Sequence, residues 1–140
     1  MDDPFDLTRF VKAQADSYEH ALSEIRSGRK RTHWMWFVFP QIEGLGSSEM
    51  ARRYAIRDED EARAYLEHPI LGPRLVECFQ ALLALDGHSA FEIFGSPDYL
   101  KLHSSATLFA QVSLPSSVFH RLLDKYFESR PDDATLGILE

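Results

Sequence analysis

The stretch from Asp98 to Thr107 contains residue types at a spacing that can bind an anion. Asp98, Lys101 and Ser105 stand at i, i+3 and i+7, so on a helix they share one side. A lysine there can bind a ligand carboxylate or phosphate, with the hydroxyls of Ser104, Ser105 or Thr107 as further donors. The alternative is an intrahelical Asp98–Lys101 salt bridge, with the hydroxyls bonded to carbonyls one turn earlier. A serine–lysine pair can also act as nucleophile and base, but no oxyanion-hole motif accompanies it, so the sequence leaves open whether the protein is an enzyme.

The segment from His33 to Gln41 holds both tryptophans of the chain, and residues 34–39 form six consecutive large apolar positions. Such a run either fills a core or forms the wall of a binding site, and the sequence leaves both open. As a wall, Trp34 and Trp36 would offer flat faces and indole N–H donors to a base, a sugar or a peptide side chain. On a helix the two rings point about 200° apart, whereas on a strand they share a face. The polar edges of the run, His33 and Gln41, are candidate ligand contacts.

A loop with two glycines, from Gly44 to Ser48, follows this run and precedes an expected helix over residues 49–56. Glycines ahead of a helix N-terminus can cradle an anion on backbone N–H groups, but this loop matches neither a Walker motif nor a dinucleotide-binding motif. The alternative is a tight turn with a serine cap. Arg53 and Tyr54, in the expected helix, complete the polar and aromatic candidates.

The residues support two hypotheses for function. In the first, the His33 to Gln41 segment and the helix from Asp98 to Thr107 meet in a pocket for a small ligand, such as a nucleotide or an ADP-ribose-like compound. A separation of Trp36 and Lys101 beyond about 15 Å would exclude this pocket, because that exceeds the span of a drug-sized site. In the second, stacked short helices present a groove or ridge to a partner protein, without chemistry. The ligand-binding candidates of the first hypothesis are His33, Trp34, Trp36, Gln41, Arg53, Tyr54, Asp98, Lys101, Ser104 and Ser105.

Composition and charge narrow the classes of function. The formal net charge of −7 disfavours a nucleic-acid partner, for which a basic surface is expected. The six histidines are scattered, and the single cysteine allows neither an internal disulfide nor a multi-cysteine metal site, so we expect no metal and no other cofactor. We see no signal peptide and no apolar stretch of about 18 residues, so the sequence predicts a cytoplasmic protein without a membrane segment.

Periodicity and capping motifs predict an all-α fold, a single domain over residues 1–140 made of about eight short to medium helices. Apolar stripes mark helices over residues 71–83, 99–112 and 118–126, and a last short helix is expected over 133–139. Gly28 and Gly95 are expected to end helices. Helix N-caps are expected at Asp6, Asp16, Asp58, Ser89 and Ser96.

Several motifs resemble, in order along nearly the whole chain, the signature of domain-of-unknown-function family 1810. The first is Arg-x-His-Trp-Met-Trp-Phe-Val-Phe-Pro-Gln-Ile-x-Gly-Leu-Gly over residues 31–46, and the last is Asp-x-x-Lys-Leu-x-Ser-Ser-x-Thr-Leu-Phe over residues 98–109. The resemblance implies a compact, mainly α-helical bacterial protein and no established activity. Members often carry the label calpastatin, but calpastatin inhibitory regions are disordered repeats, whereas this chain has helix caps, a core pattern and no repeat.

Overall fold

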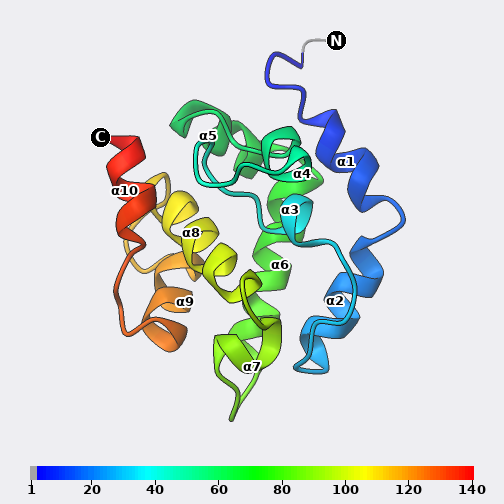
Figure 1. The fold of residues 1–140 in the computed structure, drawn as a ribbon, viewed down its shortest axis with the longest axis vertical. Coiled ribbons are helices and arrows are strands. Elements are labelled where there is room, and N and C mark those ends of the chain that lie inside the picture. The colour runs from blue at the N-terminus through cyan, green and yellow to red at the C-terminus, as the bar shows by residue number, and fades with distance from the viewer. Residues whose placement is uncertain (1–2) are drawn as a thin grey trace.

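The apolar stripes of the sequence fold into helices (Figure 1), which surround one core of aromatic and aliphatic side chains. In the computed structural model, which describes residues 3–140, the chain forms one compact all-α domain with a single isolated β-bridge and no strand. Over these residues the helices number ten rather than about eight; the sequence does not mark α3 as a helix, because it is a single turn of four residues within the aromatic run. The helices are α1 (Thr8–Gln14), α2 (Tyr18–Arg26), α3 (Met35–Val38), α4 (Glu49–Arg53), α5 (Glu59–Glu67), α6 (Leu71–Ala84), α7 (Ala90–Phe94), α8 (Asp98–Gln111), α9 (Val118–Tyr126) and α10 (Asp133–Leu139).

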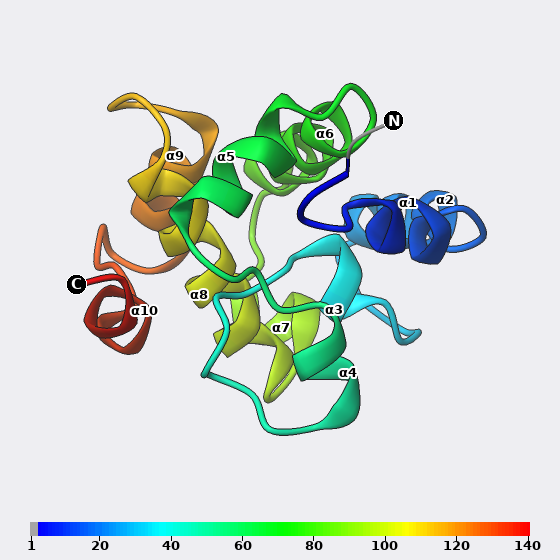
Figure 2. The same ribbon diagram turned by 90° about the horizontal axis from the view of Figure 1, so that it is seen from above.

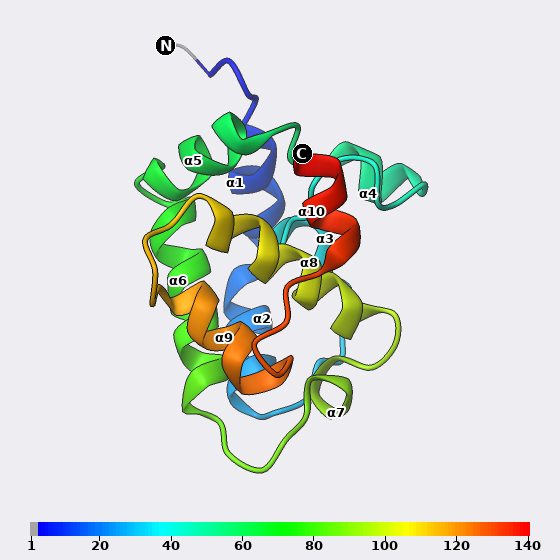
Figure 3. The same ribbon diagram turned by 90° about the vertical axis from the view of Figure 1, so that its left-hand side faces the viewer.

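Helices α6 and α8 form the centre of the fold. Helix α6 packs against α2, α5 and α9, while α8 packs against α5, α7, α9 and α10. Seen from above, α3 lies between α1 and α4 (Figure 2), and a side view shows α10 covering α8 (Figure 3). Residues 104–110 of α8 are all buried, so this helix is enclosed on every side over its second half. Its first turns, which carry Asp98 and Lys101, reach the surface, as does its last residue, Gln111. No helix within residues 3–140 has the length and apolar character to cross a membrane.

Several helix ends follow the predicted capping signals. The Asp58 carboxylate accepts a hydrogen bond of 2.9 Å from the backbone N–H three residues ahead. Ser89 and Glu92 form a reciprocal capping box at the start of α7. Gly28 and Gly95 follow the ends of α2 and α7 with φ of 80° and 71°, a left-handed conformation that glycine adopts without strain.

The other three predicted N-caps are wrong. The N-cap of α1 is Leu7 and not Asp6, and the Asp3 carboxylate caps this end by accepting hydrogen bonds of 2.8 and 3.0 Å from the backbone N–H groups of Leu7 and Thr8. Asp6 has a φ of 51°, outside the extended region that an N-cap needs. Asp16 lies one residue too early, since the N-cap of α2 is the next residue and makes no side-chain cap. Ser96 is likewise too early, because Pro97 is the N-cap of α8.

The aromatic run folds as the single turn α3 and continues into an extended segment. There the backbone N–H of Ile56 donates to the Gln41 carbonyl at 2.8 Å, within a parallel bridge between Ile42 and Ile56. This bridge explains why the helix expected over 49–56 ends at Arg53: the chain must extend to pair. Ser48 accepts a hydrogen bond of 3.1 Å at the start of α4, so the loop with two glycines ends in a serine cap.

Candidate functional site

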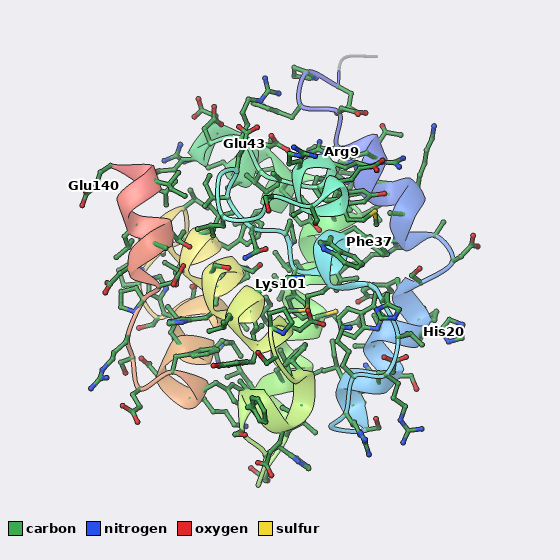
Figure 4. The ribbon with its side chains drawn as sticks, in the orientation of Figure 1. Arg9, His20, Phe37, Glu43, Lys101 and Glu140 are labelled. Carbon is green, nitrogen blue, oxygen red and sulfur yellow. The ribbon has the colours of Figure 1, made fainter. Side chains whose placement is uncertain are left out.

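The exposed first turns of α8 lie against the segment that follows α2 and against α3. Asp98 pairs with two lysines: its Oδ2 is 2.8 Å from Lys30 Nζ, and its Oδ1 is 3.5 Å from Lys101 Nζ. The Lys101 ammonium lies 5.0 Å from the centre of the Trp36 ring. Trp36 and Lys101 are thus far closer than the limit of about 15 Å that would exclude a shared site. Figure 4 shows Lys101 near the middle of the molecule.

Lys30 belongs to this site, although the sequence does not single it out. Its side chain is only 7% exposed and donates to the Thr32 carbonyl at 2.6 Å, while its backbone N–H donates to Ile93 at 2.7 Å. Its ammonium also lies 5.0 Å from the centre of the Trp34 ring. In the sequence, Lys30 stands in a basic run after a helix, which is the usual composition of a helix C-terminus. Only the folded chain brings it to Asp98.

The two tryptophans have different environments because α3 is helical. Trp34 is 1% exposed and packs against aromatic side chains of the core, with Phe39 and Phe94 rings 6.0 and 6.3 Å away. Trp36 is half-buried, packs on the edge of the core and keeps part of its ring at the surface. The two rings therefore do not form one platform, and Trp36 is the aromatic side chain that a ligand can reach.

Glu24 fixes the segment that carries Lys30 and Trp34. Its carboxylate accepts hydrogen bonds of 2.7 to 3.1 Å from Arg31 N, from the N–H and hydroxyl of Thr32, and from Trp34 Nε1. Burial alone would raise the pKa of this carboxyl, but these donors outweigh it and lower the pKa from 4.5 to about 2. The Glu24 side chain therefore stays ionised at neutral pH and holds the loop in place.

Gln41 is fixed against α8 one turn beyond Lys101. Its Nε2 donates to the Ser104 hydroxyl at 2.6 Å, and that hydroxyl also lies 3.3 and 3.2 Å from the carbonyls of Leu100 and Lys101. Ser105 is fully buried, and its hydroxyl has no hydrogen-bond partner among the described residues. It belongs to the packed half of α8 and is out of reach of a ligand.

The remaining sequence candidates lie elsewhere. His33 lines a separate hollow of about 230 Å³ together with Trp34 and residues at and just ahead of the start of α2. Tyr54 is buried at the end of α4, where its ring lies 5.7 Å from Phe10 and 5.4 Å from Phe37. Arg53 lies over that tyrosine, with its guanidinium 5.5 Å from the ring centre. Arg53 and Tyr54 thus share the α1–α4 side of the molecule and not the site at α8.

We call the residues at the start of α8 the Lys101 cluster: Lys30, Trp36, Gln41, Asp98 and Lys101. Two ammonium groups face one carboxylate, so the cluster carries a local positive charge in a chain of net charge −7. Its ammonium groups can bind an oxygen anion, its tryptophan offers an aromatic surface, and its side-chain amide can form hydrogen bonds with the polar groups of a ligand. Among the residues that the structure describes, no three histidine, cysteine, aspartate or glutamate side chains are arranged to hold a metal ion.

Fold and site together define a compact helical protein with a lysine–aspartate–tryptophan cluster on its surface. The chain belongs to the family described as protein of unknown function (DUF1810), whose model matches residues 4–139. It is similar to the crystal structure of the conserved hypothetical protein Rv1873 from Mycobacterium tuberculosis, with 54% sequence identity over 98% of each chain and a TM-score of 0.96. No curated protein matches the chain. The resemblance seen in the sequence motifs is thereby confirmed, together with the all-α fold.

Proposed function

We propose that this protein binds a small anionic ligand with a planar ring at the Lys101 cluster, and that it acts in the cytoplasm. A nucleotide or an ADP-ribose-like compound has both features, because its phosphates are anionic and its base is aromatic. The observation that carries the proposal is the Lys101 ammonium, which lies on the Trp36 ring and has only Asp98, at 3.5 Å, as an ionic partner among the described residues.

Lys101 keeps hydrogen-bonding capacity for a ligand. An ammonium group has three N–H donors, whereas Asp98 binds Lys30 at 2.8 Å and leaves Lys101 the longer contact of 3.5 Å. The Lys101 side chain is 21% exposed, so an incoming oxygen can reach it. A phosphate or carboxylate oxygen there would gain a charge-assisted hydrogen bond, which is about twice as strong as a neutral one.

Trp36 and Gln41 supply the means to hold a ring next to that anion. Stacking of a base on an aromatic side chain contributes about 1–3 kcal/mol and tolerates different bases. The Gln41 side-chain amide is held by Ser104 through its Nε2, and its side-chain oxygen, Oε1, accepts no hydrogen bond from the described residues. That oxygen is available to a donor on a base or a ribose. The proposed site thus combines one cation, one ring and one fixed amide.

A thermal unfolding experiment with ADP-ribose, AMP and adenosine tests the proposal. A ligand at 100 times its Kd should stabilise the protein by about 2.7 kcal/mol. We expect ADP-ribose and AMP to raise the Tm of the wild type, and uncharged adenosine to raise it less. Lys101→Gln should lose most of this shift, whereas Arg121→Gln, which changes an exposed arginine on α9, should keep it. An equal shift in Lys101→Gln and the wild type, or no shift with either anionic compound, would contradict the proposal.

A second candidate function, docking of a partner protein, is favoured by an apolar corner between α7 and α8. Phe91 is 58% exposed and packs edge-on against Tyr99 at 5.5 Å, and the neighbouring Leu100 is 50% exposed. Exposed large apolar side chains on adjacent helices are typical of contact surfaces. If the corner binds a second copy of this chain, sedimentation should show a dimer that Phe91→Ser with Leu100→Ser dissociates. A monomer at high protein concentration would argue against self-association.

A further inference from the structure

Arg9 joins the start of α1, the end of α4 and the start of α5 into one unit. Its guanidinium has five N–H donors, and all are used. Nε donates to the Arg53 carbonyl at 2.9 Å, and Nη2 donates to the Ala55 carbonyl at 2.8 Å and to Glu61 Oε2 at 2.9 Å. Nη1 donates to two carbonyls of the turn ahead of α1, at 2.6 and 2.9 Å. Because its donors are satisfied, Arg9 positions the surrounding backbone and leaves ligand binding to its neighbours.

Two adjoining hollows, of about 380 and 310 Å³, flank this guanidinium, and we call them the Arg9 hollows. Arg9 and Glu43, which line the second, lie above Lys101 in Figure 4, so the hollows are distinct from the Lys101 cluster. The first hollow is lined by Asp6, Thr8, Arg9, Lys12, Ala13, Arg53 and Tyr54. The second is lined by Phe5, Asp6, Arg9, Glu43, Arg52, Arg53, Ala55, Arg57 and Glu61.

The charges that line the Arg9 hollows leave an excess of cations. Glu61 is buried, and its negative charge is matched by Arg9 at 2.9 Å. Of the other cations, Arg57 lies 3.8 Å from the same carboxylate, while Lys12, Arg52 and Arg53 form no ion pair among residues 3–140. Five basic side chains therefore face three carboxylates in a chain whose overall charge is −7. Such a local excess attracts anions even on an acidic protein.

We propose that the Arg9 hollows are a second binding site, which takes a phosphorylated small molecule through a multiply charged phosphate or pyrophosphate group. Arginine suits this role because its planar fork binds phosphate oxygens in a bidentate manner. Arg53 is also partly ordered before any ligand arrives, because its guanidinium lies 5.5 Å from the centre of the Tyr54 ring and its carbonyl is held by Arg9. A preordered cation loses less conformational entropy on binding.

Isothermal titration calorimetry with inorganic pyrophosphate, on the full chain, tests this proposal. We expect saturable binding to the wild type that weakens as salt is added, because exposed charges are screened. Arg52→Gln with Arg53→Gln should weaken it by about tenfold or more, since two charge-assisted contacts are lost. Both changes keep the Arg53 carbonyl that Arg9 binds, and circular dichroism checks that the variant is folded. Arg29→Gln with Arg121→Gln removes the same charge elsewhere on the surface and should bind as the wild type does.

Three results would overturn the proposal. One is the absence of pyrophosphate binding by the wild type at low salt. Another is equal affinity in the Arg52/Arg53 variant and its charge-matched control, which would mean that only the net charge matters. The third is loss of binding in Lys101→Gln, which would assign the pyrophosphate to the Lys101 cluster. If the double variant fails to fold, the single variants Arg52→Gln and Arg53→Gln are each compared with Arg121→Gln by the same criteria.

Discussion

Replacing Arg9 by methionine should destabilise this protein more than the loss of any exposed charge. The Glu61 carboxylate is 1% exposed and the Arg9 side chain 16% exposed, so the substitution leaves a buried negative charge with only the longer contact of 3.8 Å to Arg57. Breaking a buried ion pair in this way costs about 3–5 kcal/mol. Because the arginine reaches solvent, water can partly solvate the freed groups, and we expect about 3 kcal/mol. That is a large part of a typical unfolding free energy of about 5–15 kcal/mol.

Urea denaturation followed by far-UV circular dichroism measures this cost. Glu61→Gln keeps the shape but loses the charge and one of the two acceptor oxygens that bind Arg9 and the Arg57 backbone N–H, so we expect about 2 kcal/mol from lost and weakened hydrogen bonds. The double variant should cost less than the sum of the two, because the second change removes the charge that the first leaves unpaired. Arg63→Met is the control, since Arg63 is 51% exposed in its pairs with Glu59 and Asp60 and should cost less than about 1 kcal/mol. Equal losses of unfolding free energy in Arg9→Met and Arg63→Met, or additive losses in the double variant, would show that the buried Arg9–Glu61 pair does not stabilise the fold.

Three further predictions concern single side chains. Glu24→Gln should cost about 1–2 kcal/mol at neutral pH through weakened hydrogen bonds. The pKa of Glu24 is about 2 in the folded protein, against an ordinary value of 4.5. The ionised Glu24 therefore contributes its full stabilisation of the fold above pH 4.5, and this contribution is lost as the pH falls through 2. The unfolding free energies of wild type and variant should thus converge in acid. Lys125→Met should cost about 1 kcal/mol and speed amide exchange at the end of α6, because Lys125 Nζ donates to the carbonyls of Leu82, Leu83 and Leu85 there. Burial raises the pKa of the Cys78 thiol to about 12, so a thiol reagent should modify Cys78 rapidly in urea and hardly at all in the folded protein.

The helices that the sequence predicts best are those whose signals are local. The stripes of α6, α8 and α9 repeat every three to four residues, and the expected residues 71–83, 99–112 and 118–126 agree with the observed helices to within two residues. The ends of the short helices are harder to predict from the sequence, because they depend on residues that are distant along the chain. Helix α4 ends early because Ile56 pairs with the chain next to Ile42. Helix α1 takes its cap from Asp3, upstream of the predicted Asp6.

In the candidate site, too, the sequence predicts the contacts that are local and misses those that depend on tertiary packing. The Asp98–Lys101 pair follows from helical spacing, and the alternative in which serine and threonine hydroxyls bond to carbonyls one turn earlier describes Ser104 and Thr107. The position of Lys30 has no local signal, because this loop residue meets Asp98 only through tertiary packing. Arg9 and Glu61 are likewise 52 residues apart, and nothing in either neighbourhood marks them as partners.

Nuclear magnetic resonance of the two indole N–H groups tests the proposed ligand site most directly. Trp34 is buried and its Nε1 donates to Glu24 at 2.9 Å, whereas Trp36 is half-buried beneath the Lys101 ammonium. On titration with ADP-ribose, we expect a saturable shift of the Trp36 indole resonance, assigned through Trp36→Phe, and little change in that of Trp34. The Trp36 shift should disappear in Lys101→Gln. An unmoved Trp36 resonance at saturating ADP-ribose, or the same shift in Lys101→Gln as in the wild type, would show that the Lys101 cluster is not the ligand site.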